Sequence, residues 1–293
     1  MAAPGNTQQP TPAWLAHIDA MASEIVPMTV PLELDTLAII KKMLLAPADD
    51  NDGAVDRAVQ ELRTYYRTTV SSPDASGGVQ DYPAKLVMFV VGAVVDHVFE
   101  LAKVVDRRDP AHKRLADLLV GLKRSGAAVK FDAENPQLGW ESENLDWHAA
   151  EIWRSFTPDH TSPAEECTSA LNTHALLARL VAGDLFPVDG GWRTAKCISE
   201  GLQHPPSQEF AIDTPLVRAC RAAIAAQYVL LAGDVLVRQL GAEGDAALRR
   251  AEWPSWAERL KTLAAAAAED GIPEWDLKGS AAEAAKKVEG WLN

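Results

Sequence analysis

A single stretch, Pro215 to Leu240, constrains the fold more than any other part of the 293-residue chain. Its sequence, PLVRACRAAIAAQYVLLAGDVLVRQL, places Ala, Ile, Val, Leu and Tyr on nearly every side of a helix. A helix that is apolar all round must be buried among other elements. Asp213 and Thr214 are both suitable N-caps. Pro215 suits the first turn and Gly241 a C-cap, so the sequence also predicts where this helix begins and ends.

One polar seam interrupts this apolar surface. Cys220, Gln227 and Asp234 recur every seven residues, a spacing that keeps side chains within about 20° of one another on a helix. Inside an apolar surface, Gln227 and Asp234 must be hydrogen-bonded or must reach a cavity. Arg238, four residues after Asp234, offers an intrahelical ion pair. Arg218 and Arg221, one turn apart near the N-terminal end, are placed to hold an anionic group or a neighbouring carboxylate.

A second strongly apolar stretch covers residues 83–106, and helical periodicity recurs along most of the chain. Ala-rich runs, many Leu and Glu and the lack of a convincing strand pattern favour helices throughout. Because no linker is long enough to divide the chain, we predict one all-α domain over residues 13–293. It is a bundle of about ten helices around the apolar helices 83–106 and 215–240. Residues 1–12, rich in Pro and Gln, are expected to form a disordered tail.

Two histidines fall on apolar faces of predicted helices. His97 lies within the apolar stretch 83–106, and His174 shares its face with Cys167 in a later helix. Such a histidine is either a hydrogen-bonded core residue or a ligand or base, and the sequence leaves both roles open. Cys167 and His174 are two turns apart, about 10 Å along the axis, so they cannot form a nucleophile–base pair directly.

The helix that carries His174 has clear boundary signals and a second, polar stripe. Ser162 is expected to act as its N-cap, ahead of Pro163 at the first helical position. The helix is expected to end at Gly183. Asn172 and Arg179 lie seven residues apart and therefore share one face.

Composition excludes several classes of partner. The chain has 41 acidic against 28 basic residues and a net charge of −13, which disfavours binding to nucleic acid or to anionic membrane surfaces. Its three dispersed cysteines form neither a disulfide framework nor a metal cassette, and they suit a reducing compartment. The N-terminus lacks a signal-peptide pattern, and no uninterrupted apolar run is long enough for a bilayer. We therefore expect a cytoplasmic protein without a membrane span.

A run of aspartates, Asp49, Asp50 and Asp52, raises Mg²⁺-dependent isoprenoid chemistry as one alternative. Such motifs need carboxylates one helical turn apart, whereas the residue four after Asp49 is Gly53. The same carboxylates would stabilise the start of the helix predicted from Ala54, and we favour that role. We expect no metal and no cofactor, because HExxH, CxxC, a glycine-rich phosphate loop and G-x-S-x-G are missing from the sequence.

Three segments carry a family resemblance. They are ALNTHALLARL from Ala170 to Leu180, AAQYVLLAGD from Ala225 to Asp234, and the Trp-x-x-Trp at 253–256. In these segments the chain resembles a family of uncharacterised fungal proteins, a domain of unknown function common in filamentous ascomycetes. The resemblance covers most of residues 30–290. It implies an all-α fungal protein and carries over no catalytic residue.

We hypothesise that the helices enclose a lipophilic small molecule. The protein would be a metal-independent cyclase, pericyclase or isomerase of fungal secondary metabolism, acting through shape, water exclusion and a few hydrogen bonds. The expected catalytic residues are His174, Gln227 and Asp234, and with His97 they must line one cavity. The residues expected to bind the substrate are His97, Trp147, Trp153, Asn172, Arg179, Trp192, Arg221 and Tyr228.

The main alternative is a non-catalytic scaffold or interaction module, in which the polar seam only fixes helix register. An exposed apolar groove beside Trp253 and Trp256 would support that alternative. The sequence leaves open which of the two holds, and it leaves the oligomeric state open as well.

Overall fold

The computed structural model describes residues 12–25, 32–65, 83–125, 153, 158–186, 190–203, 212–239, 250–266 and 272–292. Its helices are α1 (Ala13–Glu24), α2 (Leu32–Leu44), α3 (Asn51–Tyr65), α4 (Pro83–Val104), α5 (Pro110–Ser125), α7 (Ala164–Ala182), α8 (Gly190–Leu202), α9 (Pro215–Gln239), α11 (Trp253–Ala266) and α12 (Leu277–Leu292), with short 3₁₀ helices η1 (Ala48–Asp50) and η7 (Pro273–Trp275). Within these ranges there is no strand, so the predicted all-α bundle is confirmed. The tail predicted for residues 1–12 lies outside the described residues except for Pro12, which precedes α1. The single-domain boundary stays a prediction.

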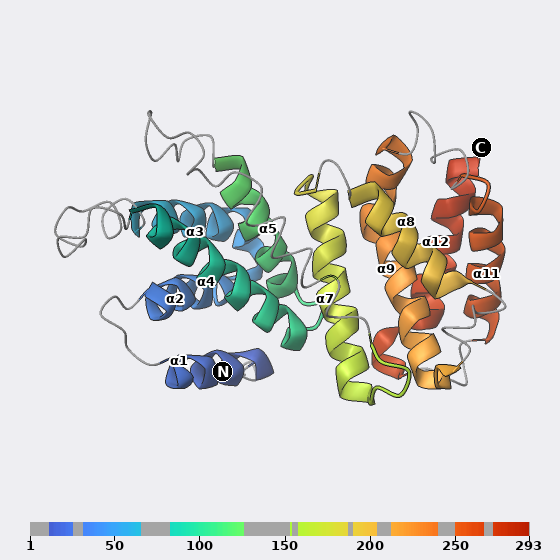
Figure 1. Ribbon diagram of the computed structural model, residues 1–293, viewed down its shortest axis with the longest axis horizontal. Coiled ribbons are helices and arrows are strands. Elements are labelled where there is room, and N and C mark those ends of the chain that lie inside the picture. The colour runs from blue at the N-terminus through green and yellow to red at the C-terminus, as the bar shows by residue number, and fades with distance from the viewer. Residues whose placement is uncertain are drawn as a thin grey trace, which may run out of the picture.

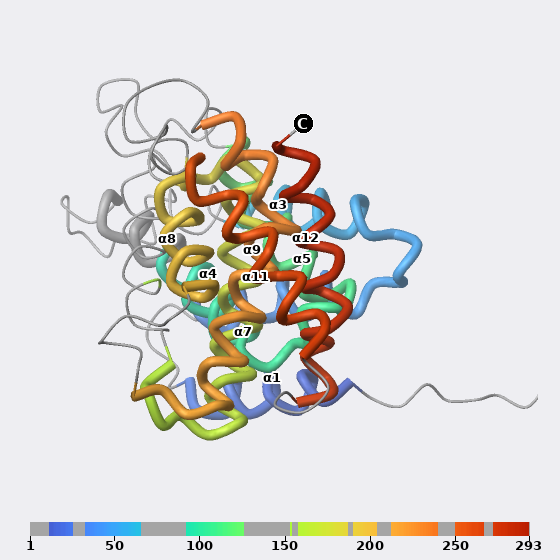
Figure 2. Tube along the Cα trace, turned by 90° about the vertical axis from the view of Figure 1, so that its right-hand side faces the viewer, coloured from blue at the N-terminus to red at the C-terminus, as the bar shows by residue number. Residues whose placement is uncertain are grey.

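Helix α7 stands between two groups of helices (Figure 1). On one side it packs against α4 and α5, which continue into α2 and α3. On the other side it packs against α9, which in turn carries α8 and α12. Figure 2 views this second group from its outer side, where α11 and α12 run next to each other. Because α7 contacts both groups, it has no face directed wholly to water.

The sequence of α7 is consistent with this central position. Every residue from Ala170 to Ala178 is buried, including the polar Asn172 and His174. The predicted N-cap at Ser162 is wrong, because α7 begins at Ala164 with no side-chain cap. The Ser162 hydroxyl instead accepts a hydrogen bond from the backbone N–H of Asp159 at 3.0 Å, which closes the turn ahead of the helix.

The two helices predicted to be apolar are both present as α4 and α9. In α9, the hydroxyl of Thr214 accepts from the N–H of Val217 at 3.3 Å, which confirms Thr214 as the N-cap. By length and composition α9 could cross a bilayer, but 72% of its most apolar window is buried inside the bundle. That burial is typical of the core helix of a folded domain. In α4, Val94, Val98 and Leu101 are fully buried.

The two tryptophans of the C-terminal helices are core residues. Trp253 and Trp256 are both 3% exposed, and Trp253 packs edge-on against Trp291 with 5.2 Å between ring centroids. A β-carbon on Gly233 of α9 would lie 2.3 Å from the Trp291 ring, so that glycine permits the close approach of α12. Because both side chains are almost fully buried, they do not form the exposed apolar groove that the interaction hypothesis expected beside Trp253 and Trp256.

A buried polar network joins α7 to α5. The Asn172 side chain accepts from the N–H of Arg107 at 3.3 Å and donates to the carbonyl of Lys103 at 3.2 Å. Nε2 of His112 lies 3.0 Å from the carbonyl of Asn172, and Nδ1 of the same ring lies 3.1 Å from an Arg179 guanidinium nitrogen. Because a guanidinium can only donate, His112 carries its proton on Nε2 and is neutral. Burial, together with the charge of Arg179, lowers the pKa of His112 to about 3.

His112 predicts a loss of stability in mild acid. The unfolded chain binds a proton at this histidine with an ordinary pKa near 6.5, whereas the folded protein does not until about pH 3. The stability that depends on the neutral ring is therefore present above pH 6.5 and is lost as the pH falls below it. Between pH 7 and pH 5 this one group should cost about 2 kcal/mol of unfolding free energy.

Urea denaturation of the wild type and of His112→Gln at the two pH values measures this difference. The variant is expected to be less stable at pH 7, because it disturbs a buried network, but to lose less free energy on acidification. An equal loss in both proteins would contradict the assignment of the acid sensitivity to His112.

Candidate functional site

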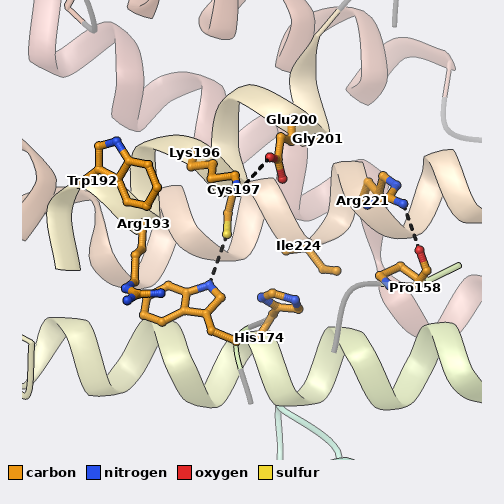
Figure 3. A pocket seen from close by; sticks show the side chains of 11 residues that line it. Pro158, His174, Trp192, Arg193, Lys196, Cys197, Glu200, Gly201, Arg221 and Ile224 are labelled. Carbon is orange, nitrogen blue, oxygen red and sulfur yellow. Dashed lines mark hydrogen bonds and ion pairs between the residues drawn. The ribbon is translucent and has the colours of Figure 1, made fainter. Parts of the chain in front are cut away.

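A cavity of about 240 Å³ lies between α7, α8 and α9 (Figure 3). Helix α8 supplies one wall, His174 rises from α7, and Arg221 and Ile224 come from α9. The residues that line it are Trp153, Pro158, His174, Trp192, Arg193, Lys196, Cys197, Glu200, Gly201, Arg221 and Ile224. Aromatic, apolar and charged groups thus meet around one space, which is the composition expected of a small-molecule site.

Trp153 forms the inner aromatic wall. Its ring stacks on Tyr228 with 6.0 Å between centroids and an interplanar angle of 7°, and it meets Phe186 edge-on at 5.6 Å. Its indole N–H donates to the sulfur of Cys197 at 3.4 Å. The Arg193 guanidinium lies 5.2 Å from the centre of the Trp153 ring. These contacts fix the orientation of the indole and hold this wall of the cavity in place.

Trp192 forms the rim of the cavity. It is 49% exposed, and the ammonium group of Lys196 lies 5.8 Å from its ring. A large aromatic residue that remains half in water beside a cavity offers apolar area for a ligand to cover.

His174 and Tyr228 form a hydrogen-bonded pair behind the cavity wall. Nδ1 of His174 lies 3.1 Å from the hydroxyl of Tyr228, and the two rings meet edge-on at 5.8 Å. Burial raises the pKa of Tyr228 well above its ordinary value, so this residue stays a phenol. Burial also raises the pKa of the nearby Cys197 thiol to about 11. At neutral pH Cys197 is therefore a thiol and a poor nucleophile.

A buried ion-pair network holds one end of the cavity. Asp213, at the N-terminal end of α9, accepts from Nε of Arg221 at 2.8 Å and lies 2.5 Å from Nδ1 of His160. Arg221 also donates to the carbonyl of Pro158 at 2.8 Å (Figure 3). The side chain of Asp213 is fully buried, so the loss of Arg221 would leave a carboxylate in the interior with His160 as its remaining side-chain partner. The guanidinium of Arg221 thus positions the turn at Pro158, which lines the cavity.

The structure brings together some of the residues that the sequence predicted for a site. His174, Trp153, Trp192 and Arg221 line the cavity, and Tyr228 lies directly behind Trp153 and His174. Trp147 lies outside the described residues. Whether these residues bind or convert a substrate stays a prediction.

Three other predicted binding residues lie elsewhere. His97 is buried between α4 and α2, where its Nε2 lies 3.0 Å from the carbonyl of Glu33, and burial lowers its pKa. Asn172 and Arg179 belong to the network between α7 and α5. These three were expected at a cavity because each shares a helix with apolar residues. The structure instead hydrogen-bonds them to other parts of the core.

The polar seam of α9 does not reach the cavity. Gln227 is half-buried and lies outside the lining, and Asp234 is exposed and pairs with Lys287 of α12 at 3.2 Å. Asp234 therefore forms its ion pair with another helix instead of with Arg238, four residues further on. Among the described residues, no common cavity joins Gln227 and Asp234 to His97 and His174, as the sequence hypothesis required. Within the described part of the chain, His174 alone of the four lines the cavity.

Sequence reasoning missed the contribution of α8. Five of the lining residues that it did not predict, Arg193, Lys196, Cys197, Glu200 and Gly201, belong to this helix. Their spacing at i, i+3 and i+4 places them on one face. The sequence could have indicated this wall of the cavity through that shared face, which has Trp192 at one end and Gly201 at the other.

The aspartates at 49–52 do not form a cluster in the structure. Asp50 pairs with Arg57, and Asp52 lies in the first turn of α3 next to Asn51. Among the described residues, no group of three side chains is placed to hold a metal ion. The position of Asp52 suits the predicted role of stabilising a helix start.

The fold and the cavity together define an all-helical protein with a small internal site between its central helices. A family model described as "Protein of unknown function (DUF3632)" matches residues 96–287. The match covers more than half of the chain, and the chain belongs to this family. No curated protein and no solved structure matched the chain. The predicted membership of an uncharacterised domain family is confirmed, and the fungal origin stays a prediction.

Gly201 provides a test of how the cavity is built. A β-carbon at this position would lie 2.3 Å from the backbone oxygen of Arg221 and 2.7 Å from the β-carbon of Ala225. Gly201→Ala should therefore force α8 away from α9 and cost about 1–3 kcal/mol of unfolding free energy, as overpacking does. Thermal and urea denaturation measure this loss.

Gly290 of α12 is the matched control, because a β-carbon there meets nothing within 4 Å. Gly290→Ala should be neutral or stabilise the protein by up to about 1 kcal/mol, through helix propensity. If both alanine variants had equal stability, the close approach of α8 to α9 at Gly201 would be disproved.

Proposed function

We propose that the protein binds a small, largely apolar, planar molecule in the cavity between α7, α8 and α9. The observation that carries this proposal is the pair of tryptophans at the cavity, with Trp153 as the inner wall and the half-exposed Trp192 as the rim. A flat apolar ligand that covers Trp192 removes its exposed ring from water, which favours binding. The volume of about 240 Å³ suits a molecule of one or two rings.

The charges around the cavity support a ligand without a net charge. Lys196 lies 3.6 Å from Glu200, and Arg221 is paired with Asp213 at 2.8 Å. Because these charges already have partners inside the protein, the cavity does not need a counter-ion from the ligand. The same groups remain available as hydrogen-bond donors and acceptors that orient a polar substituent.

We extend the proposal to catalysis by proton transfer, as in a metal-independent isomerase or cyclase of secondary metabolism. His174 is the lining residue suited to this step, because imidazole both donates and accepts protons at physiological pH. Its contact with Tyr228, which burial keeps as a phenol, fixes the orientation of the ring. Cys197 is excluded as the nucleophile by its raised pKa of about 11.

Native mass spectrometry tests the binding proposal. The wild type, isolated without denaturation from a fungal host, is expected to carry a stoichiometric ligand that solvent extraction releases. In Trp192→Ala the fraction of protein that carries the ligand should fall at least tenfold. The melting temperature should stay nearly unchanged, because the removed ring is 49% exposed. Leu292→Ala, which removes a 46% exposed side chain on α12, is the control and should keep the ligand. An empty wild type would refute the proposal.

Conversion of the extracted ligand tests the catalytic extension. An isomerase or cyclase leaves the mass unchanged, so the product should differ from its precursor in chromatographic retention and NMR spectrum alone. His174→Asn retains a polar atom near Nδ1 but cannot relay a proton at neutral pH. It should bind the ligand and lower the rate of conversion by about 100-fold or more. Equal rates in both proteins would remove His174 from catalysis and leave the binding proposal intact.

A further inference from the structure

A second cavity, of about 290 Å³, lies on the other side of α8, against the first turns of α11. The residues that line it are Ser199, Leu202, Gln203, Glu252, Ser255, Trp256 and Arg259. It shares no lining residue with the first cavity, so α8 separates the two.

Arg259 sets this second cavity apart. Its side chain is half-buried, and its Nε atom is buried without a hydrogen-bond partner. Burial lowers its pKa, and no carboxylate opposes that shift. Other interior arginines are held by protein groups: Arg114 donates to carbonyls of the segment after α2, and Arg221 is paired with Asp213. In the part of the chain that the structure describes, Arg259 forms no ion pair, so its positive charge lacks the partner that a half-buried guanidinium needs.

The other groups of the cavity restrict what can bind next to Arg259. The carboxylate of Glu252 accepts a hydrogen bond from the hydroxyl of Ser199 at 2.9 Å. Its negative charge in the same cavity disfavours a ligand with two negative charges, such as hydrogen phosphate. Trp256 and Leu202 are 3% and 4% exposed, and these small exposed parts supply an apolar edge of the cavity.

We propose that this cavity binds a small organic monocarboxylate, whose carboxylate pairs with Arg259 and whose apolar part packs against Trp256 and Leu202. The planar guanidinium matches a carboxylate in a bidentate geometry, which supplies the missing partner for the arginine. The carboxylate of the ligand pairs with Arg259, whereas the carboxylate of Glu252 in the same cavity would repel a second negative charge.

Isothermal titration calorimetry of the full chain with sodium 4-methylpentanoate tests the proposal. The wild type should bind this probe, and Arg259→Gln should weaken binding by at least tenfold. Arg250→Gln removes the same charge from an exposed residue just before α11, whose guanidinium lies over Trp253, so it should bind like the wild type. Equal binding by the two variants, or no binding by the wild type at millimolar probe, would overturn the proposal. Tighter binding of inorganic phosphate than of the probe would overturn the choice of a monocarboxylate.

Melting temperatures distinguish this binding role from a structural one. Because Arg259 forms no ion pair with any described residue, Arg259→Gln should keep or raise the melting temperature of the free protein. A fall of several degrees would show that the arginine holds the fold together, and would contradict the proposal. Trp192→Ala should leave binding of 4-methylpentanoate unchanged, because Trp192 belongs to the first cavity. The two binding proposals can therefore be refuted independently of each other.

Discussion

The burial of α7 on both sides is the constraint on which the rest of the structure depends. A helix between α4 and α5 on one side and α9 on the other cannot leave its polar side chains to bulk water. Asn172 and Arg179 therefore bind backbone groups and His112 on the side of α5, and His174 binds Tyr228 on the side of α9. The polar side chains of α7 must be hydrogen-bonded, and their partners join the two groups of helices. The same need places the His174 imidazole at the cavity.

The cavity itself follows from how α8 is attached to α9. At Gly201 the two helices approach so closely that no side chain fits between them. Trp192 lies nine residues earlier, about 13 Å away along the helix axis, and its ring is half-exposed at the rim. Between these two points, Trp153 fills part of the space and is held by its contacts with Tyr228 and Cys197. The arrangement leaves a pocket whose inner wall is held by these contacts and whose rim carries the Trp192 ring.

Local patterns predicted the helices, because apolar periodicity and capping residues act within one or two turns. The helix at 215–240 and its cap at Thr214 were accessible in this way. The face that each helix turns toward its neighbours could not be predicted in this way. Asn172 and Arg179 do share a face, as their spacing requires, but only the packing of α5 against α7 decides that this face binds His112 and lines no cavity. Asp234 was misplaced because an Ala-rich helix gives no local signal of which side meets solvent.

The two cavities beside α8 differ in one physical property, the balance of charge within their walls. In the first, Lys196 is paired with Glu200, and Arg221 is paired with Asp213. In the second, Glu252 accepts a hydrogen bond from Ser199, whereas Arg259 forms no ion pair with the residues that the structure describes. A half-buried charge without a partner lowers the stability of the empty protein, and an anion that enters the site recovers that free energy as binding free energy. Under the two proposals, the first cavity would select its ligand by shape and the second by charge, and α8 would separate two sites of different specificity.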